Sequence, residues 1–146
     1  MKSLPLLLVL VVIVSASGCE IGPRSGQGLR LPNGDVAQGK KAFQRLGCGG
    51  CHSIAGEDAE ASEPPGDVVV VLGGEVGHVE THGELVTSIV NPSHGFPLEY
   101  PREEVADKGR SKMTNFNDTM TVKELIDLTE YLQSKYAFSP YEVYDD

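Results

Sequence analysis

Hydrophobic residues recur at helical spacing in three segments of the chain. The first segment carries small and apolar residues on one predicted helical face, at Val36, Gly39, Phe43 and Leu46. Asp35 can cap its N-terminus, Gln38 stands where it could bond back, and Gly47 ends it. A glycine inside a helix costs about 1 kcal/mol relative to alanine. We therefore expect Gly39 to lie where another helix packs closely.

The other two helical segments each begin with a Ser/Thr-x-x-Glu capping box, which satisfies backbone N–H groups at a helix start. The boxes are formed by Thr81 with Glu84 and by Thr121 with Glu124. Apolar residues follow at helical spacing, first at Leu85, Val86, Ile89 and Val90, then at Leu125, Leu128 and Leu132. The middle helix should end at Asn91-Pro92 and the last one near Lys135.

The remaining segments lack helical periodicity. Residues 53–66 are acidic and contain proline and glycine, which predicts a loop. Residues 68–80 hold a β-branched run before Gly73-Gly74, which predicts a small β-hairpin. Residues 97–112 predict a charged loop of a length usually kept for function. The fold class is therefore mainly α.

Composition narrows the range of partners. The chain has 146 residues, of which 12 are basic and 21 acidic, for a net charge of −9. This length suits one domain. The acidic excess argues against nucleic acid, whose phosphates would repel it, and against a purely electrostatic attachment to an anionic membrane.

The first 18 residues are typical of a secretory signal peptide. A basic start at Lys2 precedes an apolar run over 4–14 that is too short to span a membrane, and small residues follow. Cys19, directly after Ala16-Ser17-Gly18, resembles the processing site of bacterial lipoproteins, where the cysteine carries the lipid. We expect a protein anchored on the periplasmic side of a bacterial membrane. The alternative is ordinary cleavage near Gly18, which would release a soluble periplasmic protein with a free thiol.

The mature chain divides into three parts by composition. Residues 19–34 are rich in Gly, Pro, Ser and Gln and predict a flexible tether behind the lipidated cysteine. Residues 35–136 hold the predicted helices and form the folded domain. Residues 137–146 form an aromatic and acidic C-terminal tail.

The candidate chemistry lies in Cys48-Gly49-Gly50-Cys51-His52. This is the C-x-x-C-H pattern of c-type haem attachment, in which two thiols bond the haem vinyl groups and the histidine binds the iron. A thioredoxin-like dithiol, a zinc site and a tight disulfide are the alternatives. With lipid on Cys19 and haem on Cys48 and Cys51, none of the three cysteines is left over.

Here the chain resembles the small monohaem cytochromes c with histidine and methionine ligands (class I type). The resemblance covers residues 35–136 and rests on Gly39, Phe43, Cys48, Cys51, His52, Met113-Thr114-Asn115-Phe116 and Tyr131-Leu132. It implies a cytochrome c fold of three to four helices around one covalently bound haem. It also implies that the first and last helices cross near Gly39 and that the middle helix walls the haem.

The resemblance further implies how the axial histidine is held. In this family a proline carbonyl a dozen residues after the histidine accepts its second N–H, which fixes the orientation of the ring. Pro64 stands at that position, and Pro65 is an equal candidate.

The sixth iron ligand must come from far along the chain. By the resemblance it is Met113, which precedes the last helix. Met120 has a sufficient structural role as a hydrophobic staple with Leu125. The sixth position could instead be open, or one of the loop histidines His78, His82 and His94 could fill it.

Together these features predict an electron carrier rather than an enzyme. The chain would pass single electrons between redox proteins outside the cytoplasm, and its acidic loop at 57–63, if not merely solvated, would steer it to a basic docking surface. His78 and His82 with nearby glutamates resemble a metal cluster, but a solvated surface is the better interpretation. The alternative functions are a haem subunit of a larger dehydrogenase or oxidase and a haem that binds gas or peroxide through a displaceable sixth ligand.

Overall fold

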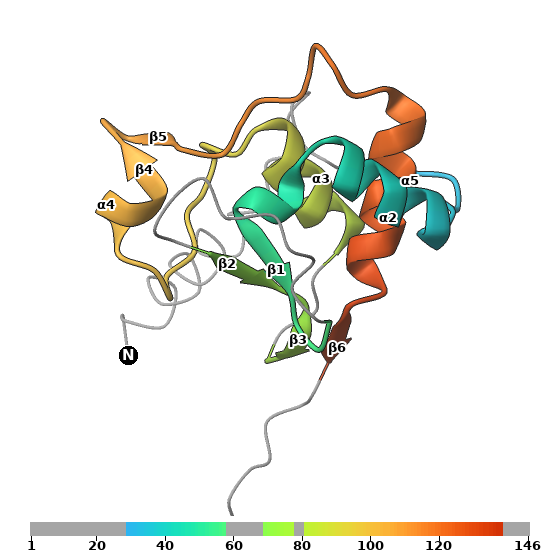
Figure 1. The fold of residues 1–146 in the computed structure, drawn as a ribbon, viewed down its shortest axis with the longest axis horizontal. Helices are drawn as coiled ribbons and strands as arrows, with labels where there is room; N and C mark the ends of the chain where they lie inside the picture. Colours follow the sequence, from blue (N-terminus) through green and yellow to red (C-terminus); the bar gives the residue numbers. More distant parts are fainter. Residues whose placement is uncertain (1–28, 58–68, 78–80, 139–146) are drawn as a thin grey trace, which may run out of the picture.

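The computed structural model describes residues 29–57, 69–77 and 81–138, which form a small, mainly helical fold with short strands (Figure 1). The helices are α2 (Val36–Arg45), the short 3-10 helix η1 (Cys48–Gly50), α3 (His82–Val90), α4 (Arg102–Val105) and α5 (Val122–Gln133). The strands are β1 (His52–Ile54), β2 (Val70–Leu72), β3 (Gly74–Val76), β4 (Ala106–Asp107), β5 (Arg110–Ser111) and β6 (Tyr136–Phe138). The predicted signal peptide and Cys19 lie outside the described residues. None of the described helices is long and apolar enough to cross a membrane.

The predicted helix starts are confirmed at the level of single hydrogen bonds. Thr81 and Thr121 each accept from a backbone N–H with the hydroxyl, while Glu84 and Glu124 bond back, so both capping boxes are complete. Asp35 caps α2 by accepting from the backbone N–H of Gln38 at 2.9 Å. Each of the three long helices therefore begins where its capping residue predicts.

Helices α2 and α5 cross at Gly39, as predicted. A Cβ at Gly39 would fall on the backbone carbonyl of Asp127 and lie 2.6 Å from the Cβ of Tyr131. The same closeness recurs just before α2, where a Cβ at Gly34 would lie 2.7 Å from the Cβ of Glu130. The two helix backbones therefore pack at a distance that only glycine permits.

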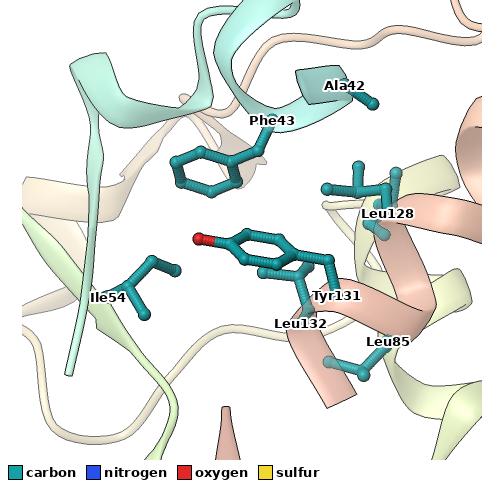
Figure 2. Packing of buried hydrophobic residues seen from close by; sticks show 8 residues of the cluster. Ala42, Phe43, Ile54, Leu85, Leu128, Tyr131 and Leu132 are labelled. Carbon is teal, nitrogen blue, oxygen red and sulfur yellow. The ribbon is translucent and has the colours of Figure 1, made fainter. Parts of the chain in front are cut away.

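A cluster of apolar side chains fills the space beside this crossing (Figure 2). Phe43 of α2 meets Tyr131 of α5 edge to face, with ring centroids 5.8 Å apart and an interplanar angle of 63°. Such a pair adds about 1 kcal/mol to the gain from burial. The buried members are Ala42, Phe43, Ile54, Leu85, Ile89, Leu128, Tyr131 and Leu132. The core thus joins α2, α3 and α5 to the end of β1.

Polar contacts fix the two ends of the crossing. Asp127 of α5 is only 3% exposed and accepts from the backbone N–H of Asp35 at 2.9 Å. Lys123 donates to both carboxylate oxygens of Asp127 at 2.6 Å. The hydrogen bonds from Lys123 and then from the Asp35 backbone lower the pKa of Asp127. At the other end, Arg45 pairs with Glu124 at 2.6 Å. These contacts set how α2 is placed along α5.

The predicted hairpin over 68–80 is wrong, although both of its strands exist. β2 pairs in parallel with β1, with Val70 opposite His52, and β3 pairs in parallel with β6. Only Gly73 separates β2 from β3, and one residue is too short for a hairpin turn. Gly73 has a φ of 84°, and a Cβ there would lie 2.8 Å from the Cβ of Lys135, so glycine is required at this position.

Two other predicted loops also contain regular structure. Residues 53–54 belong to β1, and residues 97–112 contain α4 and the antiparallel pair β4–β5. Lys108 and Gly109 form the turn of that pair with φ values of 47° and 79°, the positive-φ geometry favoured in two-residue hairpins. At the C-terminal end, Ala137 and Phe138, which composition assigned to the tail, form part of β6.

The helix crossing yields a stability prediction. Gly39→Ala should destabilise the protein by about 3 kcal/mol, because overpacking at the Asp127 carbonyl outweighs the helix preference of alanine. The matched control is Gly83→Ala in α3, where the nearest atom would be 3.8 Å from the new Cβ. That variant should keep or raise the stability. Urea denaturation measures both, and equal midpoints for the two variants would contradict the close approach at Gly39.

Candidate functional site

The C-x-x-C-H motif forms one continuous turn from a helix into a strand. Helix α2 ends at Arg45, and Gly47 then adopts a φ of 71° that redirects the chain. The backbone N–H of Cys51 donates to the carbonyl of Cys48 at 3.1 Å, which closes η1, and His52 begins β1. The position of the motif therefore follows from the position of α2.

The two cysteines are free thiols in different surroundings. Cys48 is half-buried and packs against the core cluster, and burial raises the pKa of its thiol to about 11. Cys51 is exposed. Two free thiols on one short turn, one toward the core and one toward solvent, provide two separate points for covalent attachment.

His52 is held by the neighbouring strand. Its Nδ1 lies 3.3 Å from the carbonyl oxygen of Val70 in β2. Because a carbonyl oxygen can only accept, this contact is a hydrogen bond when Nδ1 carries the proton, which leaves the lone pair on Nε2 for a metal. Burial lowers the pKa of His52, although the Val70 carbonyl opposes this, so the neutral ring is favoured. These properties fit an axial ligand to haem iron.

Val70 is the residue of the candidate site that the sequence did not reveal. Pro64 and Pro65, predicted to accept from the imidazole, lie outside the described residues, whereas the Val70 carbonyl faces Nδ1. Any residue type supplies a backbone carbonyl, so no side-chain signal marks Val70. Val70 could have been identified only from the pairing of β2 with β1.

Met113 and Met120 differ in their surroundings. Met120 packs against the core cluster, in agreement with its predicted role at the start of α5. Met113 follows β5, is half-buried, and is not among the described residues that pack on that cluster. Its backbone N–H donates to the hydroxyl of Ser111 at 3.1 Å. Of the two methionines, Met113 is the one whose side chain the core does not use.

The histidines weighed as sixth ligands have separate settings. His82 is the first residue of α3 and is half-buried, whereas His94 is exposed with Nδ1 2.9 Å from the carbonyl of Asn91. Both line a cavity of about 420 Å³. Glu84 is engaged in its capping box, and within the described ranges no three His, Cys, Asp or Glu side chains are grouped to hold a metal ion. His78 lies outside those ranges.

Glu57 connects the segment after His52 to helices α2 and α5. Its carboxylate pairs with Lys135 at 2.6 Å and with Lys40 at 3.1 Å, and it accepts from the Tyr131 hydroxyl at 3.3 Å. The bonds from Lys135 and then Lys40 lower the pKa of Glu57 to about 2. Glu57 is therefore more than a solvated side chain, since it is 30% exposed and engaged in these contacts, whereas residues 58–63 of the predicted acidic loop lie outside the described residues.

The described geometry brings the motif residues together with Val70 and gives Met113 no place in the core. Cys48, Cys51 and His52 arise from one turn, and Val70 joins them through strand pairing. Comparisons with protein-family models, curated proteins and solved structures found no match. The functional argument therefore rests on the residues and their chemistry.

The Glu57 contacts yield a pH prediction. The folded pKa of about 2 lies below the ordinary value of 4.5, so the stabilisation is complete above pH 4.5 and is lost as the pH falls toward 2. At pH 7, Glu57→Gln should lower the free energy of unfolding by about 1 kcal/mol, a modest amount because the lysine partners of Glu57 are partly exposed. Near pH 2 the substitution should leave the free energy of unfolding unchanged. The exposed Glu99→Gln is the control and should change stability little at either pH. A Glu57→Gln effect that is the same at both pH values would contradict the role of the carboxylate charge.

Proposed function

We propose that this chain is a monohaem c-type cytochrome that carries single electrons. The observation that carries the proposal is the C-x-x-C-H turn, in which two free thiols precede a half-buried histidine with its Nδ1 against a carbonyl. A covalently held haem supplies a reversible one-electron couple between ferrous and ferric iron. Covalent attachment retains the cofactor outside the cytoplasm, where a lost haem is not recovered.

Each residue has one role in this proposal. Cys48 and Cys51 would hold the haem through thioether bonds, and His52 would offer Nε2 to the iron while the Val70 carbonyl fixes its ring. Met113 is the proposed sixth ligand, because its thioether is not used in the core. A thioether favours ferrous iron more than a second imidazole does, so this ligand set gives a higher potential.

The proposed fold is that of the class I cytochromes c. It is supported by the crossing of α2 and α5 at Gly39, with the motif directly after α2. In this proposal α3 forms a wall beside the haem. With His52 and Met113 both bound, the iron would be closed to small molecules, so the chain would pass electrons and turn over no substrate.

The proposed location is the periplasmic side of a bacterial membrane. Residues 1–18 would direct export, Cys19 would carry the lipid, and residues 20–34 would tether the domain. Several acyl chains together anchor a protein firmly, whereas one alone binds marginally. The partners would be redox proteins within reach of the tether.

Absorption spectra of the exported protein test the function. We expect a covalent c-type haem by alkaline pyridine haemochrome, a methionine-to-iron band in the oxidised protein, and no change of the reduced spectrum with carbon monoxide. Met113→Leu should abolish the band and admit carbon monoxide, because it removes the thioether while keeping the volume. The matched control Met120→Leu should keep both properties, because Met120 packs on the core.

Three different results would contradict the proposed function. Rapid carbon monoxide binding by the unaltered protein would favour a haem that reacts with gas or peroxide. Co-purification with a larger complex in mild detergent would favour a haem subunit of a dehydrogenase or oxidase. A chain without covalent haem after export would disprove the proposal.

Fractionation of cells tests the anchor. The unaltered protein should sediment with membranes and resist a high-salt wash, because its attachment is apolar. Cys19→Ser should move the haem protein to the soluble periplasmic fraction with its spectrum unchanged. Membrane attachment that survives this substitution would show that Cys19 is not the anchor.

A further inference from the structure

Tyr100 reaches from the segment before α4 to the outer edge of β2. Its hydroxyl oxygen accepts from the backbone N–H of Val71 at 3.0 Å, a contact between residues 29 positions apart. β2 bonds β1 along its other edge, where the N–H of Val70 donates to the carbonyl of Cys51. Tyr100 therefore supplies a polar partner on the side of β2 that faces away from the motif.

This contact and the His52 contact share one peptide group. The N–H of Val71 and the C=O of Val70 belong to the same planar amide and point in opposite directions. Tyr100 bonds the N–H end at 3.0 Å, and Nδ1 of His52 lies at the C=O end at 3.3 Å. A single chain of hydrogen bonds thus runs from the Tyr100 hydroxyl through the amide to the imidazole.

We propose that Tyr100 is a positioning residue for His52 and acts through the Val70–Val71 peptide. Its hydroxyl fixes the tilt of the amide plane and therefore the direction of the carbonyl that holds the ring. A hydrogen bond to the N–H end also polarises the C=O end, because bonds in such chains strengthen one another. A stronger acceptor makes the imidazole more electron-rich, which stabilises ferric iron. The effect on iron rests on the proposed function, whereas the hydrogen-bond chain does not.

The surroundings show why this edge needs a fixed partner. β2 has three residues, and Val71 is 53% exposed. Without Tyr100 its N–H would bond water, which holds no fixed direction. The Tyr100 side chain is half-buried and lines a cavity of about 400 Å³ with Phe96 and Arg102. Arg102 stacks 4.1 Å above the Phe96 ring, so this segment has local order of its own.

Tyr100→Phe tests the proposal, because it removes the hydroxyl and keeps the ring. In the haem-loaded protein we expect the reduction potential to rise. In the reduced protein, NMR should show exchange of the Val71 amide proton about fivefold faster, and faster exchange of the Nδ1 proton of His52. The control Tyr136→Phe removes a hydroxyl from β6, in a different strand pair, and should leave the potential and both protons unchanged.

The outcomes separate this proposal from the proposed function. If Tyr100→Phe alters only the unfolding midpoint while the potential and the His52 proton stay unchanged, Tyr100 is merely structural and the proposal is overturned. If the exported chain holds no covalent haem, the proposed function fails. The same NMR comparison on the haem-free full chain then decides the proposal. Faster exchange at Val71 together with a changed His52 tautomer supports the chain of bonds, and unchanged signals overturn it.

Discussion

The backbone contact between α2 and α5 at Gly39 is the constraint on which the rest of the structure depends. A Cβ at this position would meet the Asp127 carbonyl, so the two helices can cross here only because the residue is glycine. The edge-to-face contact of Phe43 with Tyr131 and the Arg45–Glu124 pair both follow from the crossing. Because Gly47 and η1 follow α2 directly, the crossing also decides where Cys48, Cys51 and His52 lie.

Ion pairs also hold the segment that follows the motif against α2 and the end of α5. Glu57 lies five residues after His52 and binds Lys40 of α2 and Lys135 just after α5. The segment that carries the histidine is therefore attached to the helix pair at both of its ends, by covalent continuity before the motif and by ion pairs after it. Partly exposed ion pairs contribute modestly to stability, so their main effect is to fix the path of this segment.

Local signals in the sequence predicted the helices well and the strands poorly. Capping boxes and apolar spacing are properties of neighbouring residues, so Thr81, Thr121 and Asp35 could be identified as helix starts before any fold was known. The strands have two or three residues each, and β1–β2 and β3–β6 pair across long stretches of chain. A β-branched run shows that a strand exists but not which strand it joins, so the hairpin over 68–80 was the wrong pairing.

The same contrast between local and long-range signals applies to the candidate site. Its reactive atoms, the two thiols and the imidazole, come from five consecutive residues and were predictable because their chemistry depends on side-chain type and spacing. The group that orients the imidazole is a backbone carbonyl brought in by a parallel strand, and strand pairing has no residue signature of its own. Substitutions near Val70 that keep the main chain in place should therefore be tolerated, whereas changes that shift β2 should disturb His52 without touching the motif. The histidine is thus specified by sequence, and its orientation is specified by tertiary structure.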